Sequence, residues 1–343
     1  MPPRFPPRAP MGGLYSFHLA LGTWKGCLNE NKCMRANNNR PRLIVIVGST
    51  AVGKTEVAIR LAREWGGQII SADSMQVYRH MDIGTAKPTA EERSLVVHHL
   101  IDVVNPNEQF NAAMFVELAR GIIGQLHSRN KPIFVVGGTG LYVKALLGGL
   151  FKGPDADEDL RKLYKEELKH FGKTYLYEKL RKKDEQAAAQ IDKNDAVRII
   201  RALEVLELCG ESIVEKQKAH RFGDDLYECK KIGLTLERSL LNGKIDQRTE
   251  KMIRDGLIDE VKILLSMGYR ENLKPMQALG YKHIVRHLKG KSSLEDAVRL
   301  IKRDTRHFAK RQMTWFNADK EIAWVSPSDI DAIREQIDRF LSQ

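Results

Sequence analysis

A glycine-rich segment near the start of the sequence has the composition and spacing of a phosphate-binding loop. Residues 48–55 read Gly-Ser-Thr-Ala-Val-Gly-Lys-Thr, which matches the pattern G-x-x-x-x-G-K-[ST]. Glycines allow the backbone N–H groups to surround an anion, a helix N-terminus follows, and Lys54 adds a full positive charge. The hydroxyl of Thr55 is placed to bind a magnesium ion, so Mg²⁺ is the expected cofactor. We therefore predict that a phosphate or diphosphate group binds to Gly48, Ser49, Thr50, Ala51, Val52, Gly53, Lys54 and Thr55.

The residues around this loop predict an α/β fold. Residues 43–47 are apolar and β-branched, as in a buried parallel strand, and residues 56–62 carry apolar side chains at helical spacing. The same alternation continues, with strands predicted at 68–72 and 132–136 and a helix at 112–129. Such alternation is typical of a parallel sheet covered by helices, which binds its ligands at the carboxyl ends of the strands.

Three polar residues, Thr55, Asp73 and Thr139, each follow a predicted strand, so they can converge at one edge of the sheet. Nucleotide hydrolases and kinases usually place a second acid after an apolar strand to hold magnesium. Here the strand at 133–136 is followed by Gly-Gly-Thr instead. Asp73 is the strand-end acid that remains near the site, and it could serve as a metal ligand or as a general base.

The sequence after Pro154 is strongly charged and helical, which predicts an all-helical segment inserted into the P-loop parallel-sheet core. One helix is well marked over 196–208, where Asn194 or Asp195 can cap the N-terminus and Gly210 can end the helix. The predicted domains are an N-terminal extension at 1–41 that is disordered or wrongly assigned to the chain, the first part of the P-loop core at 42–153, the helical insertion at 154–225, and the completion of the core at 226–343, with a strand near 231–235.

Two further helices are predicted, at 245–267 and at 294–316, and Arg248 lies at the edge of the apolar stripe of the first. In the second helix, four basic side chains fall within roughly 60° of one another at about 100° per residue. Acids that would neutralise them are nearly absent, since only Asp304 interrupts the run. A merely solvated face is the alternative, but the shortage of acids favours contact with a phosphate backbone. This basic stripe consists of Arg299, Arg303, Arg306 and Lys310, and Ala297, Ile301 and Phe308 lie on the opposite side.

The bulk composition agrees with a nucleic-acid partner. The formal net charge is +12, and a basic surface attracts polyanions. No apolar run approaches the roughly 20 residues that span a bilayer. The cysteines form no C-x-x-C pair and no zinc spacing with histidine, so we expect free thiols in a reducing compartment. These cysteines are Cys27, Cys33, Cys209 and Cys229.

Several long blocks of the sequence resemble the signature segments of one enzyme family, the tRNA dimethylallyltransferases (tRNA isopentenyltransferases). The blocks occur in the family's order and cover about residues 42–325. Eukaryotic members often carry a C-terminal zinc finger, whereas this chain has no cysteine after Cys229 and so resembles the bacterial form. The matching blocks are residues 70–78, 81–88, 98–102 and 137–142, Asn194 with Asp195, residues 198–204 and 280–282, and the segment from Thr305 to Trp315.

The resemblance implies transfer of a dimethylallyl group from dimethylallyl diphosphate to the exocyclic amine of the adenosine directly 3′ of the anticodon. Asp73 is then the expected base, Lys54 and Arg248 are the expected cations on the leaving diphosphate, and Thr139 lies near the donor and the target base. The expected partners are the anticodon arm of tRNA and dimethylallyl diphosphate, with no membrane, and the protein is expected to be a cytoplasmic monomer. The tRNA contacts that the resemblance implies are Asp73, Ser74, Met75, Gln76, Thr139, Arg161, Val197, Arg198, Ile199, Ile200, Arg201, Gly280, Tyr281, Lys282, Arg306, Lys310, Arg311 and Gln312.

Three other functions are compatible with parts of the sequence. A small-molecule kinase shares the fold and the loop but has no need of the basic stripe or the charged insertion. The related adenylate isopentenyltransferases act on free adenine nucleotides, and the insertion and the block at 310–315 favour a macromolecular acceptor instead. A non-catalytic RNA-binding protein is disfavoured because every expected catalytic position is filled.

Overall fold

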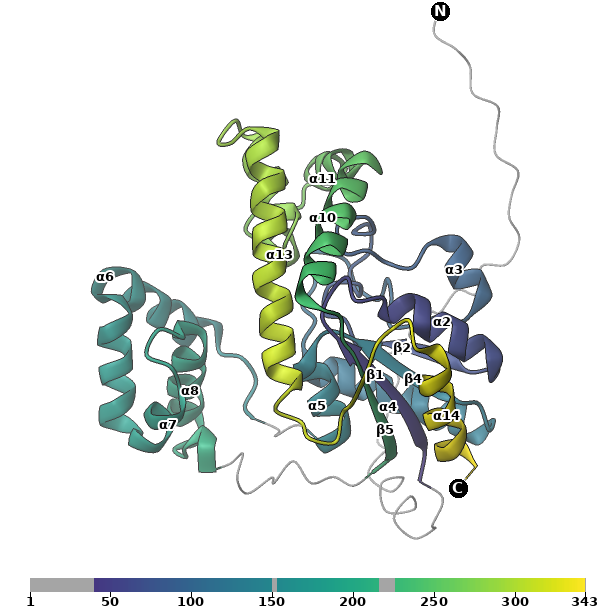
Figure 1. The fold of residues 1–343 in the computed structure, drawn as a ribbon. Helices are drawn as coiled ribbons and strands as arrows, with labels where there is room; N and C mark the ends of the chain where they lie inside the picture. Colours follow the sequence, from purple (N-terminus) through teal and green to yellow (C-terminus); the bar gives the residue numbers. More distant parts are fainter. Residues whose placement is uncertain (1–39, 150–152, 216–225, 343) are drawn as a thin grey trace, which may run out of the picture. The chain divides into compact units, whose positions relative to one another are not determined.

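The computed structural model describes residues 40–149, 153–215 and 226–342 (Figure 1). The predicted N-terminal extension, apart from its last two residues, lies outside this range. Within it, six strands form one sheet in the order β3-β2-β4-β1-β5-β6, and every neighbouring pair is parallel. The strands are β1 (Arg42–Gly48), β2 (Gln68–Ser71), β3 (His98–His99), β4 (Ile133–Gly137), β5 (Glu228–Leu234) and β6 (Ala323–Val325). The predicted parallel-sheet core is therefore confirmed.

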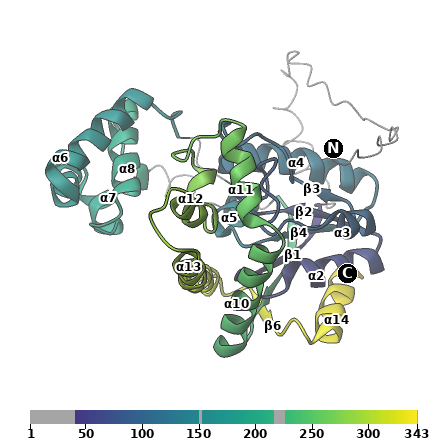
Figure 2. The ribbon, with the colours of Figure 1, turned by 90° about the horizontal axis from the view of Figure 1, so that it is seen from above.

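Helices cover both faces of this sheet, because side chains alternate between the faces along each strand. On β1, Leu43 and Val45 pack into one apolar cluster with α4 (Ala112–Ser128) and α5 (Gly140–Gly148). Ile44 and Ile46 pack into a second cluster with α2 (Lys54–Glu64) and α14 (Ile330–Leu341). Figure 2 shows α2 and α14 on one side of the strands and α4 on the other. The central strand is buried on both faces, which explains its continuous apolar sequence.

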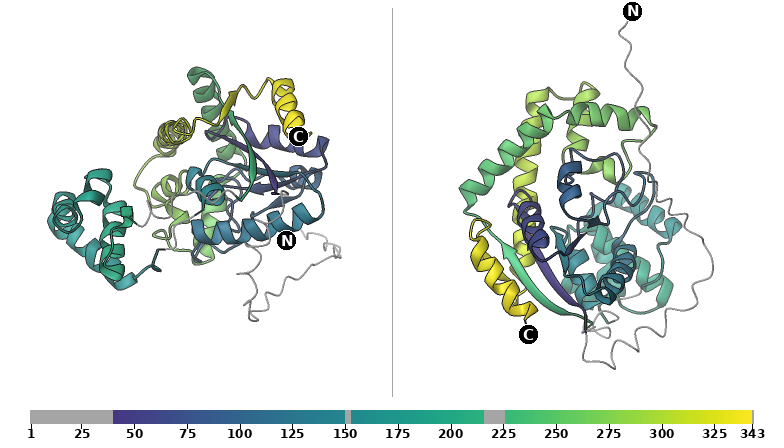
Figure 3. Two further views of the ribbon diagram at one scale, coloured as in Figure 1. Left: turned by 90° about the horizontal axis from the view of Figure 1, so that it is seen from below. Right: turned by 90° about the vertical axis from the view of Figure 1, so that its right-hand side faces the viewer.

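Among the remaining core helices, one region differs from the sequence prediction. The single helix expected at 245–267 is wrong, because Gly256 adopts φ 103° and separates two helices. The helix predicted at 294–316 has those bounds, with the hydroxyl of Ser293 accepting from the backbone N–H of Asp296 at its start. Figure 3 shows α10 and α13 side by side, and the two helices are in contact. These elements are α3 (Ala90–Leu95), α10 (Arg238–Arg254), α11 (Leu257–Ser266), η1 (Pro275–Gln277), α12 (Tyr281–Leu288) and α13 (Leu294–Phe316). No helix among the described residues is both long and apolar enough to cross a bilayer.

Three helices that follow α5 in the chain have an apolar cluster of their own. They are α6 (Glu158–Lys183), α7 (Glu185–Gln190) and α8 (Ala196–Cys209). The predicted caps of α8 are confirmed, since the Asp195 side chain accepts from the backbone N–H of Arg198 and Gly210 ends the helix with φ 67°. Inside α6, Gly172 has φ 82°, a conformation that glycine tolerates, and it introduces a kink.

A buried carboxylate on α8 connects this helix to α6 within the helical insertion. The side chain of Glu204 is fully buried and accepts from the backbone N–H of Asp157 at 2.8 Å. It also pairs with Arg161 at 2.8 Å and with Arg201 at 2.6 Å, while Arg201 donates a further bond to the Pro154 carbonyl. Burial alone would raise the pKa of Glu204, but these hydrogen bonds outweigh it and hold the pKa below its usual value. Both arginines therefore have a structural partner that the sequence analysis did not anticipate.

We expect Glu204→Leu to destabilise the insertion by about 3 kcal/mol, because it leaves two partly buried guanidinium groups without their carboxylate. Urea unfolding followed by circular dichroism measures this change in stability. The matched control is Glu207→Gln, at an exposed acid that pairs with Lys183, for which we expect a destabilisation below about 1 kcal/mol. Equal destabilisation in the two variants would contradict a special role for the buried carboxylate.

Candidate active site

The carboxyl ends of β1, β2 and β4 lie next to one another, and the loops that follow them are joined by hydrogen bonds. The backbone N–H of Thr139, after β4, donates to the carbonyl of Ala72, after β2, at 3.2 Å. The Thr139 hydroxyl accepts from the backbone N–H of Ser74 at 3.0 Å and lies 3.4 Å from the Ser74 hydroxyl. Thr139 is thus held against the turn that carries Asp73.

The loop after β1 has a backbone that only glycine permits at two positions. Gly48 has φ 145°, and a Cβ there would lie 2.6 Å from the Leu234 carbonyl oxygen. Gly53 has φ 105° and precedes the first turn of α2, so the N-terminus of that helix opens onto the loop. The hydroxyl of Ser49 is buried and has no hydrogen-bond partner among the described residues. A buried donor without a partner is rare, and an anion held by the loop would supply one.

Two cations meet at this loop. Lys54 donates from Nζ to the carbonyls of Gly48 at 3.1 Å and Ser49 at 2.7 Å. The pKa of Lys54 is lowered to about 8, chiefly by burial and also by the charge of Arg248, and the charge of Asp73 partly opposes this shift. Arg248, from α10, donates from Nη1 to the Thr50 hydroxyl at 3.4 Å. Burial lowers the pKa of Arg248 as well, against the charges of Asp73 and Glu92.

Asp73 is oriented by its own turn. Its Oδ1 accepts from the backbone N–H groups of Met75 at 2.8 Å and Gln76 at 3.3 Å. No hydrogen bond from the described part of the chain reaches its Oδ2. One carboxylate oxygen is therefore fixed by the backbone, while the other can accept a proton.

Gln76 and a distant acid hold the loop that follows this turn. Gln76 accepts from the Ser71 hydroxyl at 2.9 Å and donates to the carbonyls of Thr85 and Ala86. Glu260, from α11, accepts at 2.8 Å from the backbone N–H of both Asp82 and Ile83; it also accepts from the N–H of Gly84 at 3.1 Å and from the Tyr281 hydroxyl at 2.6 Å. Sequence reasoning missed Glu260, because an acid on an amphipathic helix carries no signal of a partner this far away in the chain.

Five residues that were predicted to contact tRNA are buried. Their burial contradicts a direct contact with tRNA. Ile199 and Ile200 belong to the apolar cluster of the insertion. Tyr281 is fully buried against Glu260, and Gly280 is buried at the start of α12. Gln312 is 8% exposed and bonds the two loops after β1 and β4. These residues support the fold of the site rather than a surface that RNA could touch.

Other predicted contacts remain accessible. In the insertion, Val197 is 79% exposed and the Arg198 side chain 63% exposed. Ser74, Met75 and Gln76 are partly exposed at the turn after β2, and Lys282 lies 3.7 Å from Asp304. Their contact with tRNA stays a prediction.

The prediction that acids are nearly absent from the basic stripe, with Asp304 alone interrupting the run, is wrong. Arg299 pairs with Asp296 at 2.8 Å and Arg303 pairs with Asp304 at 2.8 Å, both on α13. Arg306 pairs with Asp246 at 2.5 Å, and this acid lies on α10, which the sequence did not place beside the stripe. Lys310 and Arg311 differ, because both are exposed and neither has an acidic partner among the described residues. The guanidinium of Arg311 lies over the Phe308 ring at 5.8 Å.

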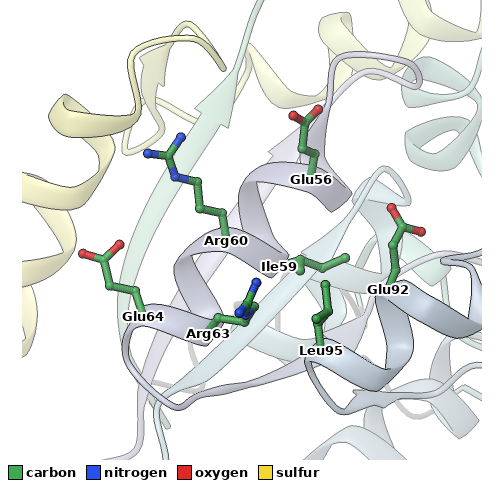
Figure 4. Close-up of a pocket in the computed structure, with 7 residues that line it drawn as sticks. All are labelled: Glu56, Ile59, Arg60, Arg63, Glu64, Glu92 and Leu95. Carbon is green, nitrogen blue, oxygen red and sulfur yellow. The ribbon is translucent and has the colours of Figure 1, made fainter.

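A hollow lies on the surface of α2 and α3 (Figure 4). Two of its acids are already engaged, since Glu64 pairs with Arg334 and Glu92 accepts from the backbone N–H of Thr89. It contains none of the predicted site residues. The hollow is lined by Glu56, Ile59, Arg60, Arg63, Glu64, Glu92 and Leu95.

A parallel sheet with a glycine-rich loop, two cations and an oriented carboxylate at its carboxyl edge is the arrangement typical of P-loop α/β enzymes. The sequence matches the IPP transferase family over residues 76–319 and the isopentenyl transferase family over residues 41–102. It is 58% identical to tRNA dimethylallyltransferase 2 of Syntrophus aciditrophicus (strain SB) over 308 residues, which cover 90% of this chain and 99% of the relative. It is 47% identical to the tRNA dimethylallyltransferase of Geobacter metallireducens, covering 88% of this chain and 98% of that protein.

Solved structures give the same assignment. The tRNA isopentenylpyrophosphate transferase of Bacillus halodurans is 42% identical, with a TM-score of 0.66 over 88% of this chain and 97% of that one. A eukaryotic dimethylallyltransferase acting on tRNA is 26% identical, with a TM-score of 0.68 over 84% of this chain and 75% of that one. The chain belongs to the tRNA dimethylallyltransferase family and is a transferase.

The pKa of Lys54 predicts how diphosphate binding depends on pH. Below about pH 8 the amine is already charged, whereas above it a proton must be taken up when an anion binds. Affinity for dimethylallyl diphosphate, the donor that the family resemblance implies, should therefore fall by roughly tenfold from pH 7 to pH 9, a range in which the ligand itself stays ionised. Titration calorimetry without tRNA measures this. Lys54→Arg stays charged throughout and should show a flat profile, and an equal decline in that variant would place the titrating group elsewhere.

Proposed function

We propose that this chain transfers a dimethylallyl group from dimethylallyl diphosphate to the exocyclic amine N6 of the adenosine 3′-adjacent to the anticodon in tRNA. The observation that carries the proposal is the meeting of Lys54 and Arg248 with Asp73 at one edge of the sheet. A leaving diphosphate needs the cations, and an attacking amine needs a base beside them.

The bond changes follow from these positions. The bond between the allylic carbon and the diphosphate oxygen breaks, and negative charge grows on the diphosphate. Lys54, Arg248 and the N–H groups of the loop stabilise that charge. The adenine amine, a poor nucleophile, forms the new carbon–nitrogen bond, and the free oxygen of Asp73 takes its proton. Thr139 keeps the turn of Asp73 in place through Ser74.

A magnesium ion fits this arrangement. Mg²⁺ usually binds through one or two protein ligands together with substrate phosphates and water. Thr55 is the second residue of α2, beside the loop. No group of three or more acidic, histidine or cysteine side chains that could bind a metal alone occurs among the described residues. Thr55 would therefore hold the ion together with the diphosphate. When bound, the ion would neutralise part of the charge of the leaving group.

The acceptor must leave its base stack before its amine can reach Asp73. We assign contact with the anticodon arm chiefly to Lys310 and Arg311 on α13, which are exposed and have no acidic partner among the described residues. Val197 and Arg198 at the start of α8 are exposed as well, and Arg198 pairs with Asp195 at 3.2 Å. The loop, the cations and the carboxylate come from one chain, so we expect the monomer to be active.

The test is mass spectrometry of nucleosides after incubation of the protein with dimethylallyl diphosphate and unmodified tRNA. Prenylated adenosine at the position after the anticodon, with release of diphosphate, is the expected result. Parallel incubation with AMP separates this function from that of an adenylate isopentenyltransferase. Product from AMP but not from tRNA would contradict the proposal.

Asp73→Asn should lower the single-turnover rate by roughly 10²–10⁴-fold, because the amide cannot take the proton of the amine. Binding of tRNA and of dimethylallyl diphosphate should change little. Asp331→Asn, at an acid that is 85% exposed on α14, serves as the control and should react at the wild-type rate. A near-normal rate for Asp73→Asn would remove this carboxylate from the mechanism.

Neutralising Lys310 and Arg311 together with glutamine should weaken tRNA binding and flatten its salt dependence. The log–log slope should fall by about 0.7–0.9 for each tRNA phosphate that the variant no longer neutralises. The matched control is a double glutamine variant at Arg299 and Arg303, whose charges are already paired on the same helix. Filter binding at several salt concentrations gives both slopes. The same decrease in both variants would mean that the ion pairs on α13 do not decide which cations contact RNA.

A further inference from the structure

Gln312 joins the two loops on which the proposed reaction depends. Its Oε1 accepts from the backbone N–H of Thr50 at 2.8 Å, in the phosphate-binding loop. Its Nε2 donates to the carbonyl of Gly138 at 2.9 Å, in the loop after β4. The side chain is 8% exposed; the bond to Gly138 is buried and the bond to Thr50 is partly buried. One planar amide therefore connects the phosphate-binding loop to the loop that carries Thr139.

Side chains of α13 approach the backbone after β4 most closely at two glycines. A Cβ on Gly138 would lie 2.3 Å from Nε2 of Gln312, and a Cβ on Gly140 would lie 2.1 Å from the Trp315 ring. Two side chains of α13, Gln312 and Trp315, thus pack against Gly138 and against Gly140 at the start of α5.

The chemistry of the position admits few substitutes. An amide carries an acceptor and a donor on one group, as the Thr50 N–H and the Gly138 carbonyl require. An ionised carboxylate of the same shape accepts only, so it would face the Gly138 carbonyl with a second negative oxygen. An apolar side chain of similar volume would leave both backbone groups without a partner.

Each loop held by Gln312 carries a group of the proposed mechanism. Thr50 is the residue whose hydroxyl accepts from Arg248. Thr139, next to Gly138, holds the turn of Asp73. The separation of these loops sets the distance between the leaving diphosphate and the base. An error of about 1 Å in such a distance can cost on the order of 10²-fold in rate.

We propose that Gln312 is a positioning residue that fixes the separation of the phosphate-binding loop (residues 48–55) and the loop after β4 that carries Gly138 and Thr139. This inference rests on the proposed function. It acts through Thr50 and Gly138 and does not touch either substrate. Its replacement should therefore lower the rate of transfer at saturating substrates and leave the binding of each substrate nearly unchanged.

The experiment compares Gln312→Met and Gln312→Glu with wild type in single-turnover transfer at saturating tRNA and dimethylallyl diphosphate. Gln312→Met should be slower by roughly 10–100-fold, with each dissociation constant within about threefold of wild type. Gln277→Met, at an exposed glutamine of η1, is the matched control and should keep the wild-type rate. A wild-type rate for Gln312→Met, or a defect confined to binding, would overturn the proposal.

The glutamate variant separates hydrogen bonding from packing. At pH 8 Gln312→Glu should be about as slow as Gln312→Met. Toward pH 6 its rate relative to wild type should rise, because a protonated carboxyl can again donate to the Gly138 carbonyl. The relative rate of Gln312→Met should stay constant over the same range. A constant relative rate for the glutamate variant as well would overturn the role of the donated bond.

Backbone amide exchange tests the inference without any reaction. In the full chain without substrates, Gln312→Met should exchange faster than Gln277→Met in peptides covering residues 48–55 and 137–140. Equal exchange would overturn the proposal. If the wild-type protein transfers nothing to tRNA, the proposed function fails, and the exchange result still decides whether Gln312 holds the two loops.

Discussion

The site depends on one electrostatic constraint, the proximity of Lys54 and Arg248 at the carboxyl end of β1. Both are partly withdrawn from water, and the charge of Arg248 contributes to the lowered pKa of Lys54. Holding two like charges together lowers the stability of the fold unless an anion offsets them. Asp73 offsets part of this charge, and a bound diphosphate would offset the rest. We therefore expect the site to be stabilised most by a ligand that carries several negative charges on adjacent oxygens.

The helices that carry these groups are held by ion pairs as well as by apolar contacts. Arg248 lies on α10, between Asp246, which pairs with Arg306, and Glu250, which pairs with Lys302 at 2.7 Å. Cations of α13 that look available in sequence are thus used to fix the helix that supplies Arg248. In the proposed function the net positive charge of the chain would have two roles, since some basic side chains hold the helix of Arg248 in place and others are exposed to a polyanion.

The parts that could be predicted from the sequence are encoded locally. The strand, loop and helix around Lys54 follow from hydrophobic spacing and glycine positions. The bounds of α8 follow from its caps, and those of α13 from the helical spacing of its side chains. The convergence of loops after β1, β2 and β4 follows from the geometry of parallel strands. The pairings of Arg306, Glu260 and Gln312 could not be predicted, because their partners lie 60, 177 and 262 residues away. Residue type and spacing contain no information on which distant backbone group a side chain will meet. The break at Gly256 was missed for a different reason, since a single glycine in a helical pattern is often tolerated.

A family signature indicates which segments surround a site. The geometry then shows which of their residues can contact a substrate and which support the fold. Lys87 lies in such a block, yet its side chain is 1% exposed and bonds Tyr78, Asp82 and Asp102. Tyr281 and Gln312 are likewise occupied by partners within the protein. Asp73 differs from all of these, because its backbone contacts use one oxygen and no described residue donates to the other. An oriented carboxylate with one free oxygen, placed beside two cations, is the physical reason to assign proton transfer to Asp73, and membership of the signature alone would not have separated it from its neighbours.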